Sequence, residues 1–173
     1  MNSVLSCIVF AFFLIYPDMA QSDGDYRWPM KLKPELTSRF CDYRAGHFHA
    51  GVDIRTRGKT GYRVYAVDDG YIYRVSTSFK GYGKALYLKL RDGRIVVYGH
   101  LSKFEDELGE EIRKLQMSVR RYNQNLFFSP DEYPVKRGRV IGYSGLSGAR
   151  APHLHFEIRS AGNNPLNPLK YGF

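Results

Sequence analysis

The chain has little cysteine, with two among its 173 residues. Cys7 lies in an apolar N-terminal segment, so only Cys41 remains if that segment is removed. A lone cysteine cannot form a disulfide within the domain, and we expect Cys41 to be a buried, inert thiol. With 43% hydrophobic and 25% charged residues, the chain is expected to form one globular domain, residues 21–173, stabilised by its own core.

Charge is absent from Val4 to Tyr16, yet the apolar run there is shorter than the roughly 20 residues that a membrane-spanning helix needs. A small-residue site follows at Met19 and Ala20. This pattern predicts a signal peptide over residues 1–20, cleaved near Ala20, and export to the periplasm or cell envelope. An uncleaved membrane anchor is the alternative.

Acidic residues are fewer than basic ones, 17 against 26, which gives a formal net charge of +9. An exported basic protein meets anionic membranes or an acidic polymer such as the cell wall. Export and the scattered basic residues argue against nucleic acid as a partner. We therefore expect peptidoglycan as the partner, no nucleic acid, and membrane contact only if the N-terminal segment is retained. Nothing in the sequence indicates an oligomeric state.

Helical patterns are also scarce, because short β-rich runs separated by turn residues dominate the chain. These runs are residues 63–67, 71–75, 85–90, 95–98, 138–143 and 152–158. The segment Arg91–Arg94 between two of the runs is typical of a hairpin turn. The pattern predicts a mostly β fold, an antiparallel β-sheet or β-sandwich.

One helix is expected at about residues 102–123. Ser102 and Glu105 have the spacing of a capping box, and apolar residues recur at helical intervals from Phe104 to Tyr122. The helix could act as a lid that shapes a substrate site. We favour the simpler interpretation, a packing element that covers one edge of the sheet.

Histidine is rare too, with five in the chain. His153 and His155 lie two apart in a strand-like segment and therefore share one face. Two imidazoles side by side form a metal site, or one metal ligand and one proton-transfer group. Glu157 lies on the same face and could orient a histidine, although a glutamate at the end of a surface strand is equally plausible.

A second group lies upstream, where His49 and Asp53 are four apart, with Gly51 between them leaving room for an ion. His47 has the same parity and is a rival ligand. His100 ends another strand-like run. A catalytic zinc site has three protein ligands and one open position for water, and His49, Asp53 and one of the two downstream histidines could supply them.

One zinc ion in such a site would lower the pKa of its bound water toward ~7, so that it can attack an amide carbonyl. The His-Glu-x-x-His helix is absent, and with it the usual glutamate base. His100 and the second histidine of the downstream pair are then the candidates for proton transfer and oxyanion stabilisation. A Ser-His-Asp hydrolase is a poor fit because no Gly-x-Ser-x-Gly elbow occurs.

Three motifs occur in a fixed order: His-x-x-x-Asp at residues 49–53, Tyr-Gly-His-Leu at 98–101 and Pro-His-Leu-His-Phe-Glu-Ile at 152–158. Together with the glycine-containing segments at 61–70 and 138–145, they resemble the lysostaphin-type (LytM-like) zinc endopeptidases. The resemblance covers about residues 40–158. It departs from the usual pattern at Cys41, where related chains usually have glycine.

The resemblance implies a lysostaphin-like β domain with zinc bound by His49, Asp53 and His155. It implies that His100 and His153 are catalytic, leaves His47 outside the site, and implies hydrolysis of peptide cross-links in bacterial peptidoglycan. D-Ala–diamino acid cross-links and glycine bridges are both substrates within the family, and the single-domain layout favours the former. The alternatives are a non-catalytic adaptor that binds peptidoglycan or activates another hydrolase, and a structural wall-binding protein.

Overall fold

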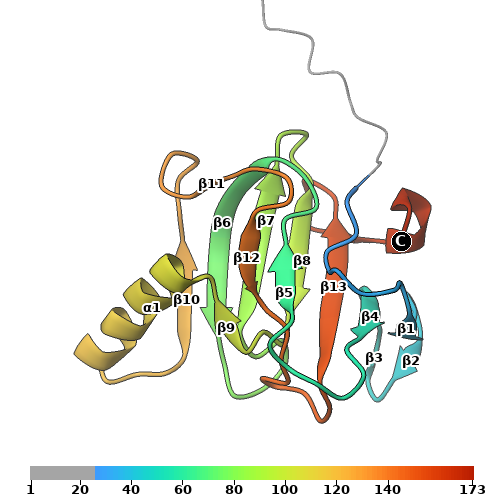
Figure 1. Cartoon of the computed structure of the whole chain (residues 1–173), viewed down its shortest axis with the longest axis horizontal. Helices are drawn as coiled ribbons and strands as arrows, with labels where there is room; N and C mark the ends of the chain where they lie inside the picture. Colours follow the sequence, from blue (N-terminus) through green and yellow to red (C-terminus); the bar gives the residue numbers. More distant parts are fainter. Residues whose placement is uncertain (1–25) are drawn as a thin grey trace, which may run out of the picture.

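The computed structural model describes residues 26–173, so the expected signal peptide at residues 1–20 lies outside the described residues. Two antiparallel sheets pack face to face, and a single α-helix flanks them (Figure 1). The large sheet is made of β1 Leu36–Ser38, β4 Val52–Arg55, β6 Gly70–Thr77, β7 Ala85–Leu90, β8 Ile95–Gly99, β10 Gln124–Phe127, β11 Pro134–Val135, β13 His153–Arg159 and β14 Pro165–Leu166. The small sheet is made of β5 Arg63–Tyr65, β9 Lys103–Phe104 and β12 Val140–Tyr143.

The remaining elements are a short hairpin, the α-helix and a C-terminal 3₁₀ turn. They are β2 Tyr43–Arg44 with β3 His47–Phe48, α1 Asp106–Ser118 and η1 Pro168–Tyr171. No helix among the described residues is long and apolar enough to cross a membrane. The predicted fold class, a mostly antiparallel β-sandwich with one α-helix, is confirmed over residues 26–173.

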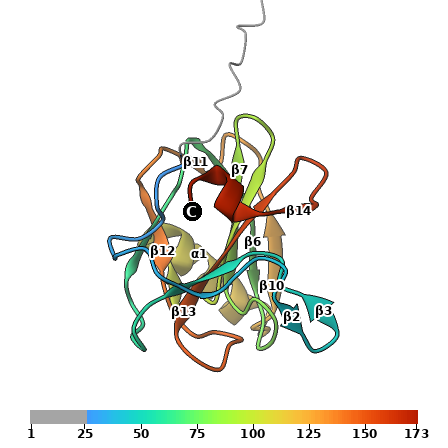
Figure 2. The same ribbon diagram turned by 90° about the vertical axis from the view of Figure 1, so that its right-hand side faces the viewer.

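The order of strands in the large sheet brings distant parts of the chain together. Its main path runs β1-β4-β13-β8-β7-β6-β10, with β11 paired to β6 and β14 paired to β13. The late strand β13 therefore lies between β4 and β8, which come from the first two histidine motifs. Figure 2 shows the same sheet edge-on, with the β2–β3 hairpin projecting beside it.

The core lies between the two sheets, where the apolar residues that alternate along the strands meet. Val64 of β5 and Ile141 of β12 pack in the same buried cluster as Leu88, Tyr98 and Phe156 of the large sheet. The hydroxyl of Tyr98 accepts a hydrogen bond from the backbone N–H of Val67 at 3.1 Å, so its polar atom is satisfied within the core.

The predicted helix at 102–123 is too long at both ends. Ser102 does not cap it: its hydroxyl donates to the carbonyl of Tyr143, and the next two residues pair with β12 as strand β9. At the other end, Arg120 adopts a positive φ of 49°, after which residues 124–127 join β6 as edge strand β10. Strand pairing thus overrides helical periodicity at both ends.

Helix α1 packs against the core. Leu108 and Ile112 are buried in the main apolar cluster, and no residue of α1 lines the groove that holds the histidines. This supports the role of a packing element over that of a lid.

Gly51 has a different role from the expected one. A Cβ at this position would lie 2.2 Å from the carbonyl oxygen of Phe156 on β13. Glycine therefore lets the segment before β4 approach the backbone of β13, and the space beside it is filled by protein rather than left for an ion.

We predict that Gly51→Ala destabilises the protein by about 2–4 kcal/mol, because a backbone atom of β13 must move. Gly109→Ala is the matched control. Gly109 lies within α1, and its new Cβ would come no closer than 3.5 Å to the nearest atom, the carbonyl oxygen of Phe104, so alanine should stabilise the protein by about 0.5–1 kcal/mol. Urea unfolding measures both changes, and equal stabilities of the two variants would contradict this account of Gly51.

Candidate metal centre and active site

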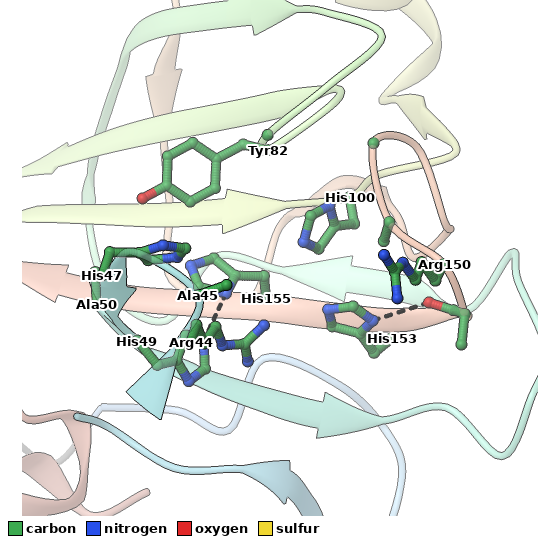
Figure 3. A pocket seen from close by; sticks show the side chains of 14 residues that line it. Arg44, Ala45, His47, His49, Ala50, Tyr82, His100, Arg150, His153 and His155 are labelled. Atoms are coloured by element: carbon green, nitrogen blue, oxygen red, sulfur yellow. Dashed lines mark hydrogen bonds between the residues drawn. The ribbon is translucent and has the colours of Figure 1, made fainter. Parts of the chain in front are cut away.

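All five histidines of the chain line a single groove of about 720 Å³ on the outer face of the large sheet (Figure 3). Four segments form its walls: the β2–β3 hairpin and the residues after it, the β6–β7 loop at Gly81 and Tyr82, the end of β8 at His100, and the β12–β13 loop. The sheet is the floor, and loops are the walls.

Three buried side chains form a tight triangle at the base of the groove. Nε2 of His49 lies 3.0 Å from Nδ1 of His155 and 3.1 Å from Oδ1 of Asp53. The third side, between Nδ1 of His155 and Oδ1 of Asp53, measures 2.9 Å. Strand register creates this arrangement, because His155 on β13 pairs directly with Asp53 on β4.

The ring of His49 is held from behind by the segment that precedes the β2–β3 hairpin. Its Nδ1 lies 2.8 Å from the carbonyl oxygen of Arg39, which can only accept, so Nδ1 carries the proton and Nε2 presents a lone pair to the triangle. Two backbone hydrogen bonds, from Cys41 to His49 and from His49 to Asp42, fasten the same segment.

The ring of His155 is held by a buried carboxylate. Its Nε2 lies 2.7 Å from Oε1 of Glu157, a fully buried residue, so Nε2–H donates and Nδ1 faces the triangle as a lone pair. Tyr82 and Arg159 also donate to Glu157, each at 2.6 Å. Burial would raise the pKa of Glu157, but the charges and hydrogen bonds of His155 and Arg159 hold it below its usual range. Of the two interpretations of Glu157, the structure therefore supports the orienting group.

Nε2 of His49, Nδ1 of His155 and Oδ1 of Asp53 thus lie within 3.1 Å of one another, each with a lone pair directed into the triangle. When both rings are neutral, none of these three atoms carries a proton. Such a cluster requires a positive charge. Burial lowers the pKa of His155, but the carboxylates of Asp53 and Glu157 outweigh this effect and raise it. Burial likewise raises the pKa of Asp53, yet the adjacent imidazoles of His155 and His49 hold it well below its usual range, since a proton gained by either ring would pair with the carboxylate. Two imidazole nitrogens and one carboxylate oxygen are a donor set that suits zinc.

The second carboxylate oxygen of Asp53 is bound on the other side. Arg44 donates to Oδ2 at 2.5 Å and also to the hydroxyl of Ser38 at 2.9 Å. The hairpin thereby fixes the rotamer of Asp53 so that Oδ1 points into the triangle.

His100 and His153 lie beside the triangle, with ring centroids 4.6 Å apart. Each ring directs Nδ1 at a backbone carbonyl, that of Ser147 at 2.8 Å and that of Ala151 at 2.9 Å. Nε2 of each neutral ring is therefore unprotonated, and that of His153 lies 3.5 Å from Oδ1 of Asp53. His100 has a φ of +58°, a strained conformation for a residue with a side chain, and such strain is often found at functional sites.

His47 and Cys41 behave differently from the site residues. His47 lines the outer part of the groove but does not belong to the triangle. Cys41 is exposed, so the prediction of a buried thiol is wrong. Its φ of +65° places it in the left-handed region, which explains why glycine suits this position.

Comparison with known proteins agrees with this geometry. Residues 47–118 match Peptidase family M23. The chain is 31% identical over 126 residues to the DD-carboxypeptidase/endopeptidase Mpg of Neisseria meningitidis serogroup B, which covers 70% of this chain and 22% of that protein. It is 28% identical over 146 residues to the murein hydrolase activator NlpD of Escherichia coli, covering 84% and 31% respectively.

The chain has the lysostaphin-like fold of peptidase family M23. The catalytic domain of the antimicrobial peptidase lysostaphin from Staphylococcus simulans superposes on this domain with a TM-score of 0.57 and 25% identity, over 80% of this chain and 91% of that one. The chain spans less than half of the length of the curated relatives it matches.

Residue spacing alone does not decide which downstream histidine joins His49 and Asp53, and the structure places His155 in the triangle and His153 beside it. The sequence patterns do not predict the roles of Arg44, Tyr82 and Arg159, which hold the side chains of Asp53 and Glu157 in place. Arg159 follows Glu157 by two residues, so the same alternation that places His153, His155 and Glu157 on one face of the strand also predicts Arg159 there. Arg44 reaches the site from the short β2–β3 hairpin and Tyr82 from the β6–β7 loop, and no sequence pattern reveals such contacts.

We predict that Glu157→Gln weakens zinc binding by roughly tenfold to a hundredfold, because a neutral amide polarises the His155 ring less and leaves Arg159 without its carboxylate. Glu110→Gln is the matched control, with the same change of charge on the exposed face of α1. Competition with a chromophoric chelator measures both affinities. Equal affinities in the two variants would remove Glu157 from the metal centre.

A second prediction concerns the zinc-free protein. Burial, together with the nearby rings of His153 and His155, lowers the pKa of His100 to about 4. The unfolded chain binds a proton near pH 6.5, so stability is complete above that pH and is lost as the pH falls toward 4. His100→Asn, which tolerates a positive φ, should reduce this acid loss by on the order of 2 kcal/mol. Urea unfolding at pH 7 and pH 5 tests it, and an unchanged pH dependence would contradict the prediction.

Proposed function

We propose that this protein is an exported zinc endopeptidase that hydrolyses peptide cross-links in bacterial peptidoglycan. One observation supports this most strongly. A triangle of three buried metal-ligand atoms lies at the base of an open groove, with two further histidines that direct unprotonated nitrogens beside it. A site that only stabilised the fold would need neither the groove nor the two extra imidazoles.

The family match and the relatives support a role in cell-wall hydrolysis, as a hydrolase or as the activator of one. The proposal that the protein is the hydrolase itself rests on the residues of this chain. His49, Asp53 and His155 would hold one zinc ion, and each has a second contact that fixes its orientation. When bound, zinc would supply Lewis acidity, which polarises a carbonyl and makes a water molecule nucleophilic near neutral pH.

The two catalytic candidates have complementary surroundings. His100 is neutral near pH 7 because burial lowers its pKa to about 4, so its Nε2 can accept a hydrogen bond or a proton from the attacking water. A proton taken up at Nε2 of His153 would face the carboxylate of Asp53 at 3.5 Å. The backbone carbonyls of Ser147 and Ala151 prevent either ring from turning its other nitrogen toward the substrate.

We further propose that the protein acts in the periplasm or cell envelope, after removal of residues 1–20. The formal net charge of +9 suits an acidic wall polymer. Small residues line much of the groove, among them Ala45, Ala50, Gly81 and Ala149, so an extended peptide can approach the metal ligands without displacing bulky side chains.

A second candidate function is that of an adaptor that activates another wall hydrolase. The likeness to the murein hydrolase activator NlpD over 84% of this chain favours it. The two functions differ in what they require of His100 and His153, since an adaptor needs neither.

We expect the purified protein to convert cross-linked dimers of isolated sacculi to monomers, and a chelator to abolish this conversion. Mass analysis of the products identifies the bond that is cut. Intact dimers in the presence of folded, zinc-loaded protein would contradict the enzyme proposal and support the adaptor.

His100→Asn sharpens the test. It should bind zinc with unchanged stoichiometry while kcat falls about a hundredfold or more, the usual contribution of a general acid or base. His47→Asn serves as the control in the same groove and should likewise keep its zinc. If His100→Asn lost zinc along with activity, His100 would be a ligand and not a proton-transfer group.

A further inference from the structure

The groove has an unbalanced set of charges. Among residues 26–173, its lining includes two arginines, Arg44 and Arg150, and no acidic residue. The buried carboxylate of Asp53 lies beneath the lining and is already shared between His49, His155 and Arg44. A ligand in the groove therefore meets a positive surface, which favours an anionic one.

The two arginines differ in how they are held. Arg44 is fixed by Asp53 and Ser38, so its charge is largely offset. Arg150 is exposed, and its guanidinium makes no hydrogen bond or ion pair with any residue in the range 26–173. It is the charged group in the groove whose donors remain available to a ligand.

Arg150 also lies close to the reacting centre. Figure 3 shows its side chain at the same end of the groove as His100 and His153. The next residue, Ala151, supplies the carbonyl that holds Nδ1 of His153. A ligand group bound by Arg150 would therefore lie next to the bond presented to these histidines.

We propose that Arg150 is a specificity-determining residue that binds a carboxylate beside the scissile bond; this rests on the proposed peptidase function. A guanidinium presents parallel N–H donors that match a carboxylate. The substrate class that fits is a direct cross-link to a diamino acid with a free carboxyl on the carbon that bears the linking amine. A glycine bridge has no carboxylate at that position.

The test uses two synthetic cross-linked peptides that are identical except that this carboxyl is free in one and a carboxamide in the other. Zinc-loaded wild-type protein should have a KM for the free acid roughly tenfold below that for the amide. Arg150→Gln should raise the KM for the acid roughly tenfold, with the loss in KM and not in kcat, and should abolish the preference. Arg150→Lys, which keeps the charge, should retain part of it.

Arg121→Gln is the matched control, because it removes the same charge from an exposed position after α1. A similar KM increase in both variants would reduce the effect to net charge and overturn the proposal. Cleavage of acid, amide and glycine peptides with equal KM would also overturn it, while the peptidase function would stand. If no peptide is cleaved, the equilibrium dissociation constants of the free-acid and carboxamide peptides are compared instead. A preference that depends on Arg150 supports the carboxylate site without the enzyme, and equal binding overturns it.

Discussion

The site depends on the register of one strand. β13 lies between β4 and β8, and its His155 pairs directly with Asp53 on one side and with Gly99 on the other. This single alignment brings together residues about a hundred positions apart and places His100, which follows Gly99, beside the same point. Because side chains alternate, a slip of one residue would turn His153, His155 and Glu157 into the core. The apolar residues Leu154 and Phe156, which are buried on the opposite face, hold the register against that slip.

Buried charge is the second constraint, and it couples the metal centre to the fold. Five side chains contact one another in a row: Arg44, Asp53, His155, Glu157 and Arg159. Each neighbour in the row carries the opposite charge or is a hydrogen-bonding partner. Each buried carboxylate thus has a cation behind it, while the lone pairs between them face one another. A buried charge destabilises the fold unless it is paired with an opposite one. The same buried carboxylates that need cations beside them for stability therefore also favour the binding of a cation between them.

The sequence predicted the parts of this arrangement that depend on local periodicity. Alternation in residues 152–158 placed both histidines on one face, and the β-rich runs predicted β6, β7, β8 and β13 of the large sheet and β5 and β12 of the small one. The errors arose where long-range contacts override a local rule. Ser102 has the spacing of a cap but bonds to Tyr143, Cys41 lies exposed in a left-handed conformation, and Gly51 accommodates the backbone of β13. Parity alone could not choose between His153 and His155, because the choice depends on which one pairs with Asp53.

The candidate metal ligands lie mainly on the sheet at the base of the groove, whereas loops form much of its walls. Residues of the walls can therefore be replaced, and the preferred substrate altered, without disturbing the residues at the base. The candidate ligands Asp53 and His155 lie on strands whose hydrogen-bonded neighbours fix them, and His49 is tied by backbone contacts to residues 39–42. Arg150 belongs to a loop and has no partner among the described residues, so replacing it costs the fold little. Under the proposed function, groups held by the sheet carry the metal chemistry, while groups on loops select which peptide reaches it.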